Sequence, residues 1–385
     1  MTSTPLGDAL SRLNTPTLLL DRARMRGNLQ RMANHIRNLD CVLRPHVKTH
    51  KSKDVLAEVA AAGNVIGITV STLHEAEYFF ENGQKDILYA VSITPNKVEI
   101  AATLIKRGCA LTVVADNIAM AELVAARAWE LGVVLPILIE LDVDGHRSGV
   151  DPQGEDLLPL ARAIAAADGA LLKGVMTHAG ESYACPTLED IKAHANLERD
   201  RTVMAADRIR ADGVECPVVS IGSTPTAVMA ENLDGITEIR PGVYTFFDLF
   251  QAGLGVAKVD DIALSVLTTV IGHQPAKGWV IVDAGWMAMS RDRGTEKQAV
   301  DQGYGLVCDL DGAPLGDVIV GAANQEHGVL MARDGAPALD IKAFPVGAML
   351  RILPNHACAT AGQYDIYNVI DGEQLTGEWE RTNRW

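Results

Sequence analysis

The chain has 385 residues, of which 48% are apolar and 22% are charged, a composition typical of a soluble globular protein. Its length suits one large domain and a smaller second one. A formal net charge of −15 argues against a nucleic-acid backbone or an anionic membrane surface as partner, because both would be repelled, and leaves small molecules as the expected ligands.

The N-terminus has neither a basic start nor an apolar core of a signal peptide, and no apolar run reaches the roughly 20 residues of a membrane span. We therefore expect a cytoplasmic protein. Its six cysteines are scattered without CxxC pairs, so disulfides are not expected. The first β-like run, Thr17–Leu20, precedes a helical segment over 22–39.

From Cys41 onward, short apolar runs alternate with Ala-rich segments of helical period. We expect strands at 41–48, 65–71, 86–92, 111–116, 136–143, 172–178, 217–222 and 237–241. The helices between them are Ser52–Ala62, Leu73–Asn82, Pro95–Arg107, Ile118–Leu131, Leu157–Ala167 and Leu188–Ala211. Eight strands favour an α/β fold with a closed (β/α)8 TIM barrel over an open doubly wound sheet, which more often has five or six.

The sequence pattern changes after Ile262, where β-like runs are separated by Gly, Asp and Pro turns and long amphipathic helices are absent. Strands are expected at 264–273, 279–284, 305–310, 318–322, 349–353, 366–370 and 374–380. The run at 17–20 has no place in a barrel that starts at Cys41. We assign it to the second domain, so that a barrel over 22–255 is followed by an all-β domain of residues 1–21 plus 256–385.

Functional groups of such barrels lie at the carboxyl ends of the strands. The residues expected there are Lys48, Ser71, Thr72, 144–149, His178–Gly180, Gly222–Thr224 and Arg240–Gly242. Glycine beside Ser223 and Thr224 lets backbone N–H groups and hydroxyls surround a phosphate. An ordinary helix N-cap is the alternative at this position.

Lys48 is the residue best suited to chemistry. Flanking by Arg44, His46 and His50, with partial burial, would lower the pKa of its ammonium and supply the neutral amine that a Schiff base needs. A reactive lysine, a phosphate cradle and arginines aimed at an aromatic ring describe a pyridoxal phosphate site. A surface lysine, as expected for Lys51 and Lys53, is the alternative.

A His-x-Cys pair, His356 and Cys358, follows the apolar run at 349–353. On an extended segment, side chains two residues apart point to the same face, so both could bind one divalent cation such as Zn²⁺. Two ligands alone do not define a metal site.

Several segments together carry a family resemblance. They are LRPHVKTHK (43–51), GHRSG (145–149), THAG (177–180), GSTPT (222–226) and PNHACAT (354–360). In this order they resemble the alanine-racemase-like (fold type III) pyridoxal phosphate enzymes, over nearly the whole chain. The resemblance is greatest to the metal-activated branch with D-threonine aldolase, eukaryotic-type D-serine dehydratase and D-threo-3-hydroxyaspartate dehydratase. Segments 282–294 and 324–328 are most similar to the last of these.

The resemblance implies that Lys48 holds the cofactor and acts as base at Cα. It implies that Arg147 approaches the phenolic oxygen, Arg240 the pyridine nitrogen and His178 the ring. The phosphate would be held by Tyr183, Gly222, Ser223, Thr224, Gly242 and Val243. His356 and Cys358 would bind the metal, with Zn²⁺ preferred over Mn²⁺ or Co²⁺, and Gln325 and His327 are candidate substrate contacts. Glu326 is a further candidate beside them. Family members are homodimers with shared active sites.

The expected activity is dehydration of a β-hydroxy-D-amino acid to a 2-oxo acid and ammonia, with D-threo-3-hydroxyaspartate or D-serine as substrate. A retro-aldol enzyme that gives glycine and an aldehyde would use the same residues. The aldolases usually have Asp where this chain has Cys358, and Gln rather than Arg at Arg240, which favours the dehydratase. A racemase would not need the metal, and a pyridoxal phosphate-binding regulator would not need the second domain.

Overall fold

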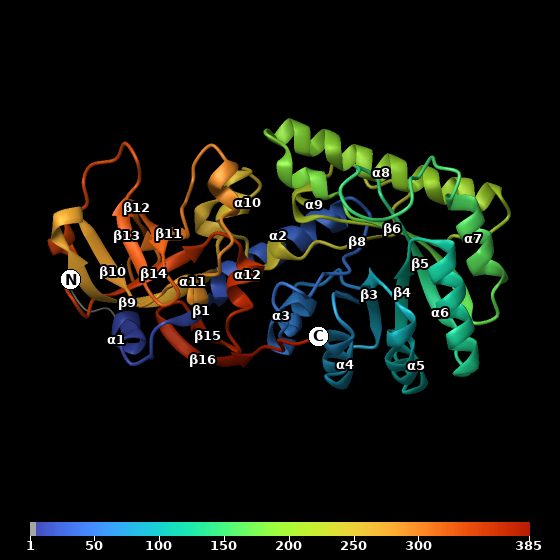
Figure 1. Ribbon diagram of the computed structural model, residues 1–385, viewed down its shortest axis with the longest axis horizontal. Coiled ribbons are helices and arrows are strands. Elements are labelled where there is room, and N and C mark those ends of the chain that lie inside the picture. The colour runs from blue at the N-terminus through green and yellow to red at the C-terminus, as the bar shows by residue number, and fades with distance from the viewer. Residues whose placement is uncertain (1–4) are drawn as a thin grey trace. The chain divides into compact units, whose positions relative to one another are not determined.

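The computed structural model describes residues 5–385, which form two compact units (Figure 1). One unit contains the chain up to Leu29 together with Val243–Asn383, and the other contains Gln30–Gly242 with the last two residues. The first boundary falls inside helix α2 (Arg22–Asn38), and the second directly after Gly242. Within residues 5–385, no helix is both long and apolar enough to cross a lipid bilayer.

The unit of residues 30–242 is a barrel of parallel strands. Seven strands pair in chain order, namely β2 (Ile68–Val70), β3 (Asp86–Ser92), β4 (Ala110–Ala115), β5 (Leu135–Leu141), β6 (Ala170–Thr177), β7 (Val218–Ile221) and β8 (Glu238–Ile239). Leu43 forms parallel bridges to both Val65 and Ile239 and so joins the two edges of this sheet. The expected (β/α)8 barrel is confirmed.

The expected first strand over 41–48 is present only as isolated bridges at Leu43 and His46. Pro45 lies between them and has no backbone N–H to donate, which interrupts the ladder. The chain then enters a turn at Val47, so Lys48 lies on that turn rather than on a strand.

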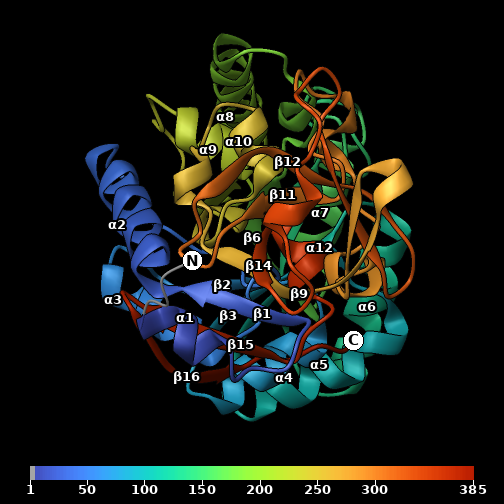
Figure 2. The ribbon, with the colours of Figure 1, turned by 90° about the vertical axis from the view of Figure 1, so that its left-hand side faces the viewer.

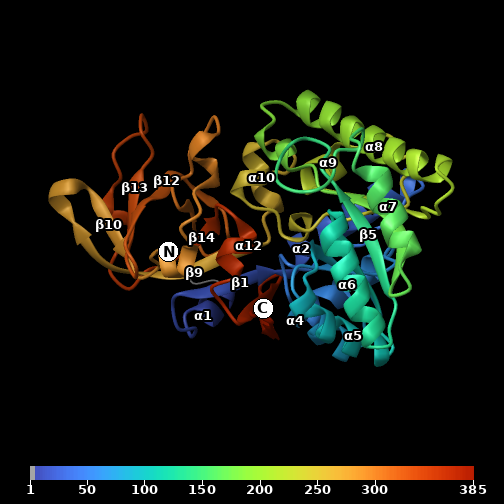
Figure 3. The same ribbon diagram turned by 45° about the vertical axis from the view of Figure 1, so that its right-hand side comes forward.

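Helices cover the outside of the barrel, as Figure 3 shows for α4 to α7. They are α3 (Lys53–Ala62), α4 (Leu73–Glu81), α5 (Val98–Lys106), α6 (Ile118–Glu130), α7 (Leu157–Ala166), α8 (Leu188–Ala211) and the short α9 (Thr224–Met229). Thr72, Asn117 and Thr187 cap α4, α6 and α8, because each side chain accepts a backbone N–H of the first turn. The expected helix at 95–107 begins as a 3-10 turn, η1 (Pro95–Lys97).

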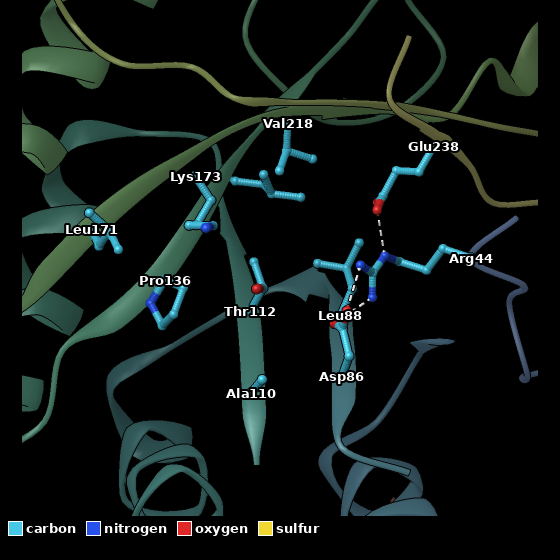
Figure 4. Close-up of a pocket in the computed structure, with 11 residues that line it drawn as sticks. Arg44, Asp86, Leu88, Ala110, Thr112, Pro136, Leu171, Lys173, Val218 and Glu238 are labelled. Atoms are coloured by element: carbon cyan, nitrogen blue, oxygen red, sulfur yellow. Dashed lines mark hydrogen bonds and ion pairs between the residues drawn. The ribbon is translucent and has the colours of Figure 1, made fainter. Parts of the chain in front are cut away.

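The barrel interior is layered. A buried apolar cluster of Leu88, Val114, Leu138 and Met176 fills its middle. At the amino ends of the strands, Leu88 and Leu138 line a cavity of about 310 Å³ together with charged residues, among them Arg44, Asp86 and Glu238 (Figure 4). At the carboxyl ends, Met176 lines a second cavity. The apolar layer therefore lies between two polar regions of the interior.

The other unit is built on a nine-stranded sheet of order β10-β13-β12-β11-β14-β9-β1-β15-β16. Its strands are β1 (Thr17–Asp21), β9 (Leu264–Gln274), β10 (Trp279–Val282), β11 (Gly305–Cys308), β12 (Pro314–Ala323), β13 (Gly328–Ala332), β14 (Met349–Pro354), β15 (Ile366–Asp371) and β16 (Gln374–Glu380). β1 pairs with β9 and with β15, so both ends of the chain share one sheet, as Figure 2 shows. The assignment of Thr17–Leu20 to this sheet is confirmed, and β13 is an addition to the expected strands.

Short helices complete this unit: α1 (Pro5–Leu10), α10 (Leu249–Gly253), α11 (Trp286–Met289) and α12 (Ala357–Ala361). The remaining 3-10 turns of the chain are η2 (Gly180–Ala184), η3 (Val243–Thr245), η4 (Val259–Asp261), η5 (Pro275–Lys277), η6 (Gly294–Lys297) and η7 (Ile341–Ala343). α1 packs Leu6 and Leu10 against Leu19, Leu267 and Ile370 of the sheet. None of the six cysteines forms a disulfide, as expected.

The extended conformation expected for the His-x-Cys pair is wrong. β14 ends at Pro354, His356 is the extended N-cap residue of α12, and Cys358 lies in the first turn of that helix. The run of small residues after His356 favours a helical turn over a strand. The two side chains are nevertheless hydrogen-bonded to each other.

Candidate active site

A cavity of about 420 Å³ lies at the carboxyl ends of the barrel strands. It brings together five of the residues to which the resemblance assigns a cofactor role, which are Lys48, Arg147, His178, Gly222 and Arg240. Further lining residues are His46, Ser71, Ala90, Val91, Ser92, Asp116, Glu140, Ser148 and Met176. The polar side chains gathered here come from seven of the eight strand ends and the turns that follow them, which is where barrel enzymes place their chemistry.

Lys48 supplies a positive charge close to two imidazoles. Burial is the main cause that lowers the pKa of His46 and His178, and the Lys48 ammonium adds to it in both cases. The pKa of His178 falls to about 3. Both rings are therefore neutral at physiological pH, and the cations that remain in this cavity are Lys48 and the two arginines.

Two of the expected neighbours of Lys48 lie elsewhere. Arg44 lines the other cavity, where its guanidinium binds Asp86 and Glu238 (Figure 4). His50 is buried and packs edge-to-face on Phe79, with ring centroids 6.1 Å apart. Residues 44 and 46 both face the barrel interior. His46 lies two residues further along the chain, so it reaches the cavity at the carboxyl ends of the strands, whereas Arg44 reaches the one at the amino ends. Arg147 and Arg240 take the place expected for Arg44.

His178 has a defined tautomer. Its Nδ1 lies 2.9 Å from the carbonyl oxygen of Gly222. Because a carbonyl only accepts, Nδ1 must carry the proton, and the low pKa leaves Nε2 unprotonated. The ring of Tyr183 lies 6.1 Å from that of His178, tilted by 41°. The carboxyl end of β6 thus presents a neutral, fixed imidazole beside an aromatic ring.

The two arginines differ in their surroundings. Arg240 is only 4% exposed and donates to the Ser220 hydroxyl and the Thr177 carbonyl. Burial lowers the pKa of Arg240 to about 10, so it remains charged at physiological pH. Arg147 is half-exposed and lies 3.5 Å from the buried carboxylate of Glu140. Burial raises the pKa of Glu140, although Arg147 opposes the shift.

The segment after β7 is a tight backbone cradle. Gly222 has φ +145°, and a Cβ there would lie 2.6 Å from the backbone nitrogen of Arg240. A Cβ at Gly242 would lie 2.9 Å from the His46 carbonyl oxygen. Only glycine leaves room at these two positions, which fits a site where the backbone closely approaches a ligand such as a phosphate.

Ser223 caps helix α9 in a capping box with Thr226, so the alternative considered for this motif is present in the structure. Thr224 is the first residue of α9, and Val243 opens η3 after Gly242. Glu198 of α8 stabilises the cradle from behind, because its Oε1 accepts the N–H groups of Ala179 and Gly222 at 3.2 and 3.0 Å.

The other unit contains the His-x-Cys pair. His356 Nδ1 lies 2.6 Å from Asp292 Oδ2. Burial lowers the pKa of His356, but the Cys358 sulfur and the Asp292 carboxylate outweigh this effect and raise it to about 11. Metal-binding histidines usually donate their second ring N–H to a carboxylate in this way, so the imidazole, the thiol and the negative surroundings fit a divalent cation.

Across residues 5–385, no three His, Cys, Asp or Glu side chains are arranged to hold a metal ion. His356 and Cys358 would thus be two protein ligands of a site that needs further ligands from water or substrate. Gln325, Glu326 and His327 lie exposed on the turn between β12 and β13. The carbonyl oxygens of Asn324 and Gln325 approach Gly285 so closely that a Cβ there would lie within 2.4 Å of both.

Three acidic residues were not assigned a role from the sequence. Glu140 and Glu198 are acids within otherwise apolar or helical segments, and the only sequence signal was a charged residue on a buried strand or helix face. Asp292 lies within the 282–294 segment that carries the resemblance. A hydrogen bond over 64 positions cannot be inferred from spacing in a single sequence.

Comparison with known proteins agrees with this geometry. Residues 20–249 match the alanine racemase N-terminal domain family, and residues 263–370 match the serine dehydratase domain family. D-threo-3-hydroxyaspartate dehydratase of Delftia sp. strain HT23 is 52% identical, covering 98% of this chain and 100% of that one. D-serine dehydratase of Dictyostelium discoideum is 32% identical over 98% of this chain and 99% of its own.

Solved structures give the same picture. The Delftia dehydratase superposes with a TM-score of 0.95 at 50% identity, covering 98% of this chain and 99% of that one. A D-threo-3-hydroxyaspartate dehydratase mutant, with a cysteine replaced by alanine and in the metal-free form, matches with the same TM-score. D-threonine aldolase of Filomicrobium marinum matches with a TM-score of 0.82 at 27% identity, over 96% of each chain.

Proposed function

The chain belongs to the alanine-racemase-like family of pyridoxal phosphate enzymes that have a C-terminal serine dehydratase domain, and we propose that it dehydrates a β-hydroxy-D-amino acid. The preferred substrate is D-threo-3-hydroxyaspartate, and the products are oxaloacetate and ammonia. The observation that carries this proposal is the 52% identity, over almost the full length, to a dehydratase of that amino acid.

Pyridoxal phosphate supplies an electron sink for the charge that develops at Cα when the α-proton leaves. Lys48 would bind the cofactor through Nζ and, once freed, take the α-proton on that nitrogen. Because the pKa values of His46 and His178 are lowered, both rings are weak bases, which leaves Lys48 as the basic group of this part of the cavity. Arg240 would donate toward the pyridine nitrogen and Arg147 toward the phenolic oxygen, while the Gly222 and Gly242 backbone, with Tyr183, Ser223, Thr224 and Val243, would hold the phosphate.

A divalent metal, with Zn²⁺ as our choice, supplies Lewis-acid assistance to the departure of the β-hydroxyl, which is a poor leaving group. His356 and Cys358 would hold it, and Asp292 would orient the His356 ring by accepting its Nδ1 proton. The α-proton and the β-hydroxyl leave the substrate as water. The remaining enamine hydrolyses in solution to the oxo acid and ammonia. Gln325 and His327 are the side chains we propose for substrate contacts, and the active enzyme is a homodimer.

A retro-aldol reaction that cleaves Cα–Cβ is the second candidate. The 3-hydroxy-D-aspartate aldolase of Paracoccus denitrificans is 29% identical over 96% of this chain and 92% of its own. We place this reaction second because Cys358 and Arg240 depart from the residues usual in the aldolases.

Chelation tests the metal and the cofactor separately. Turnover of D-threo-3-hydroxyaspartate should be abolished by a chelator and restored by Zn²⁺, Mn²⁺ or Co²⁺, while the visible absorbance of the bound cofactor persists. Turnover that survives exhaustive chelation would exclude the metal from the reaction. Loss of the cofactor absorbance on chelation would mean that the metal supports cofactor binding instead.

A further inference from the structure

A line of hydrogen-bonded polar side chains runs through the barrel interior from the amino-end cavity to Arg240. It begins at Asp86, whose carboxylate accepts two hydrogen bonds from Arg44 at 2.7 and 3.1 Å. Arg44 Nε donates to Glu238 Oε2 at 2.7 Å, and both contacts are drawn in Figure 4. Glu238 Oε1 accepts from the Ser220 hydroxyl at 2.6 Å, and Ser220 Oγ accepts from Arg240.

In each hydrogen bond of this line, the chemistry of the two groups fixes which one donates and which one accepts. A guanidinium donates and never accepts, so Ser220 Oγ must be the acceptor of its bond with Arg240. The Ser220 hydroxyl proton is then left for Glu238, which accepts it on Oε1 while Oε2 accepts from Arg44. The Arg44 guanidinium is in turn fixed by the two oxygens of Asp86. Donors from both sides, Arg240 through Ser220 and Arg44 directly, therefore converge on the Glu238 carboxylate.

The Glu238 carboxylate also offsets the electrostatic cost of burying the charge on Arg240. Burial opposes the charge on this side chain, and the Glu238 carboxylate is the strongest opposing influence, since it acts most to restore the pKa of Arg240. Both hydrogen-bond acceptors of the Arg240 guanidinium, among residues 5–385, are neutral oxygens of Ser220 and Thr177. Of the carboxylates that raise the pKa of Arg240, which also include Glu198 and Glu140, Glu238 is the one joined to it by hydrogen bonds through Ser220.

The part of this line next to Arg240 is shielded from water, whereas the Asp86 side chain at its far end is 44% exposed. Ser220 is fully buried and Glu238 is 3% exposed. In such a low-dielectric interior, a chain of hydrogen bonds in which every group has a partner is rigid. Removal of one member leaves its neighbours as buried polar groups without a partner, which destabilises their native arrangement. The orientation of the Arg240 guanidinium thus depends on residues a full layer of the barrel away from the cofactor cavity.

We propose that Ser220 and Glu238 are positioning residues that hold the Arg240 guanidinium in place, with Arg44 and Asp86 anchoring Glu238. This inference rests on the proposed function, because it requires that Arg240 faces the pyridine ring of the cofactor. It assigns a role in the reaction to the charged residues at the amino ends of the strands, a region of such barrels where conserved residues usually serve stability.

The test uses the full-length protein loaded with pyridoxal phosphate. Ser220→Ala removes the hydroxyl that joins Arg240 to Glu238, and Ser220→Thr retains a hydroxyl at this position. Glu238→Gln places an amide donor opposite either Arg44 or Ser220. Arg240→Leu serves as the reference for complete loss. Ser265→Ala is the matched control, because Ser265 is a fully buried serine that accepts from Arg351 Nε at 2.9 Å in the other unit.

Each variant is assayed for the pH dependence of the cofactor absorbance, for kcat and for Tm. Ser220→Ala should shift the absorbance in the same direction as Arg240→Leu and lower kcat about ten- to hundredfold, the effect of one charge-assisted hydrogen bond. Ser220→Thr should restore both, and Ser265→Ala should change only Tm. If Glu238→Gln does not fold, Ser220→Ala decides the question alone.

A Ser220→Ala protein with wild-type absorbance and kcat, and only a lower Tm, would overturn the positioning role. If Arg240→Leu itself leaves the absorbance and kcat unchanged, the assignment of Arg240 is wrong and the inference falls with it. A wild-type protein that binds no pyridoxal phosphate would refute the proposed function itself, which is a different result from either of these.

Discussion

Gly222→Ala should damage both the stability of the barrel and its affinity for the cofactor. The new Cβ would lie 2.6 Å from the Arg240 nitrogen and 3.0 Å from its Cα and carbonyl carbon. All three are backbone atoms of the neighbouring segment, so no flexible side chain can move aside. The φ of +145° is also one that alanine rarely adopts.

The substitution should destabilise the folded protein in two ways, which can be measured separately. Holding a non-glycine residue at such a φ costs about 1–3 kcal/mol. Forcing an extra methyl group into filled space costs about 1–3 kcal/mol more. Gly108→Ala is a control in the same unit, because Gly108 has φ +95° but a Cβ there would meet nothing within 4 Å. It should show the first cost only.

The assay is urea unfolding of both variants, followed by titration with pyridoxal phosphate. Gly222→Ala should lose about 1–3 kcal/mol more unfolding free energy than Gly108→Ala. It should also bind the cofactor more weakly, because the Gly222 peptide is held by His178 on one side and by Glu198 on the other. Equal losses of stability in the two variants would contradict the steric clash expected at Gly222. Unchanged cofactor affinity in Gly222→Ala would contradict the proposal that this backbone segment binds the cofactor.

Three further predictions concern single side chains. Lys48→Ala should abolish the labelling that borohydride and pyridoxal phosphate leave on the wild-type protein; a label retained elsewhere would move the attachment site. Asp292→Asn should weaken metal affinity about 10- to 100-fold by calorimetric titration, since the amide no longer takes the proton from His356 Nδ1 as strongly; wild-type affinity would remove Asp292 from the site. The pKa of His178 is lowered to about 3, so the unfolded chain binds a proton there that the folded chain does not, and stability should fall as pH drops from 6.5 toward 3. His178→Gln should flatten this dependence of unfolding free energy on pH, and an unchanged slope would contradict the assignment.

The sequence was sufficient for most of the fold because hydrophobic periodicity carries the information. Strands such as β5 and helices such as α8 follow from apolar runs and helical spacing over many residues. β13 has only five residues and one β-branched side chain, and α12 has only five residues, so neither has enough length for a periodic signal. The first barrel strand was overextended because its interruption depends on a single residue, Pro45.

The site was predictable where it rests on a local motif and unpredictable where it rests on pairing across the fold. Lys48, His178 and Gly222 follow from their places at strand ends, and the structure puts them in one cavity. The partners that fix them were not foreseen. Glu198 reaches the cradle from a helix, Asp292 reaches His356 from a distant loop, and Arg44 turned out to bind carboxylates in a different layer. Such contacts depend on the three-dimensional register of the barrel and sheet.

Product analysis with D-threo-3-hydroxyaspartate tests the central claim most directly. The purified protein, loaded with pyridoxal phosphate and Zn²⁺, should release ammonia and oxaloacetate in equal amounts and form no glycine. Glycine together with glyoxylate would show that Cα–Cβ is cleaved instead of the Cβ–O bond. That result would contradict the proposed dehydratase and make this chain an aldolase.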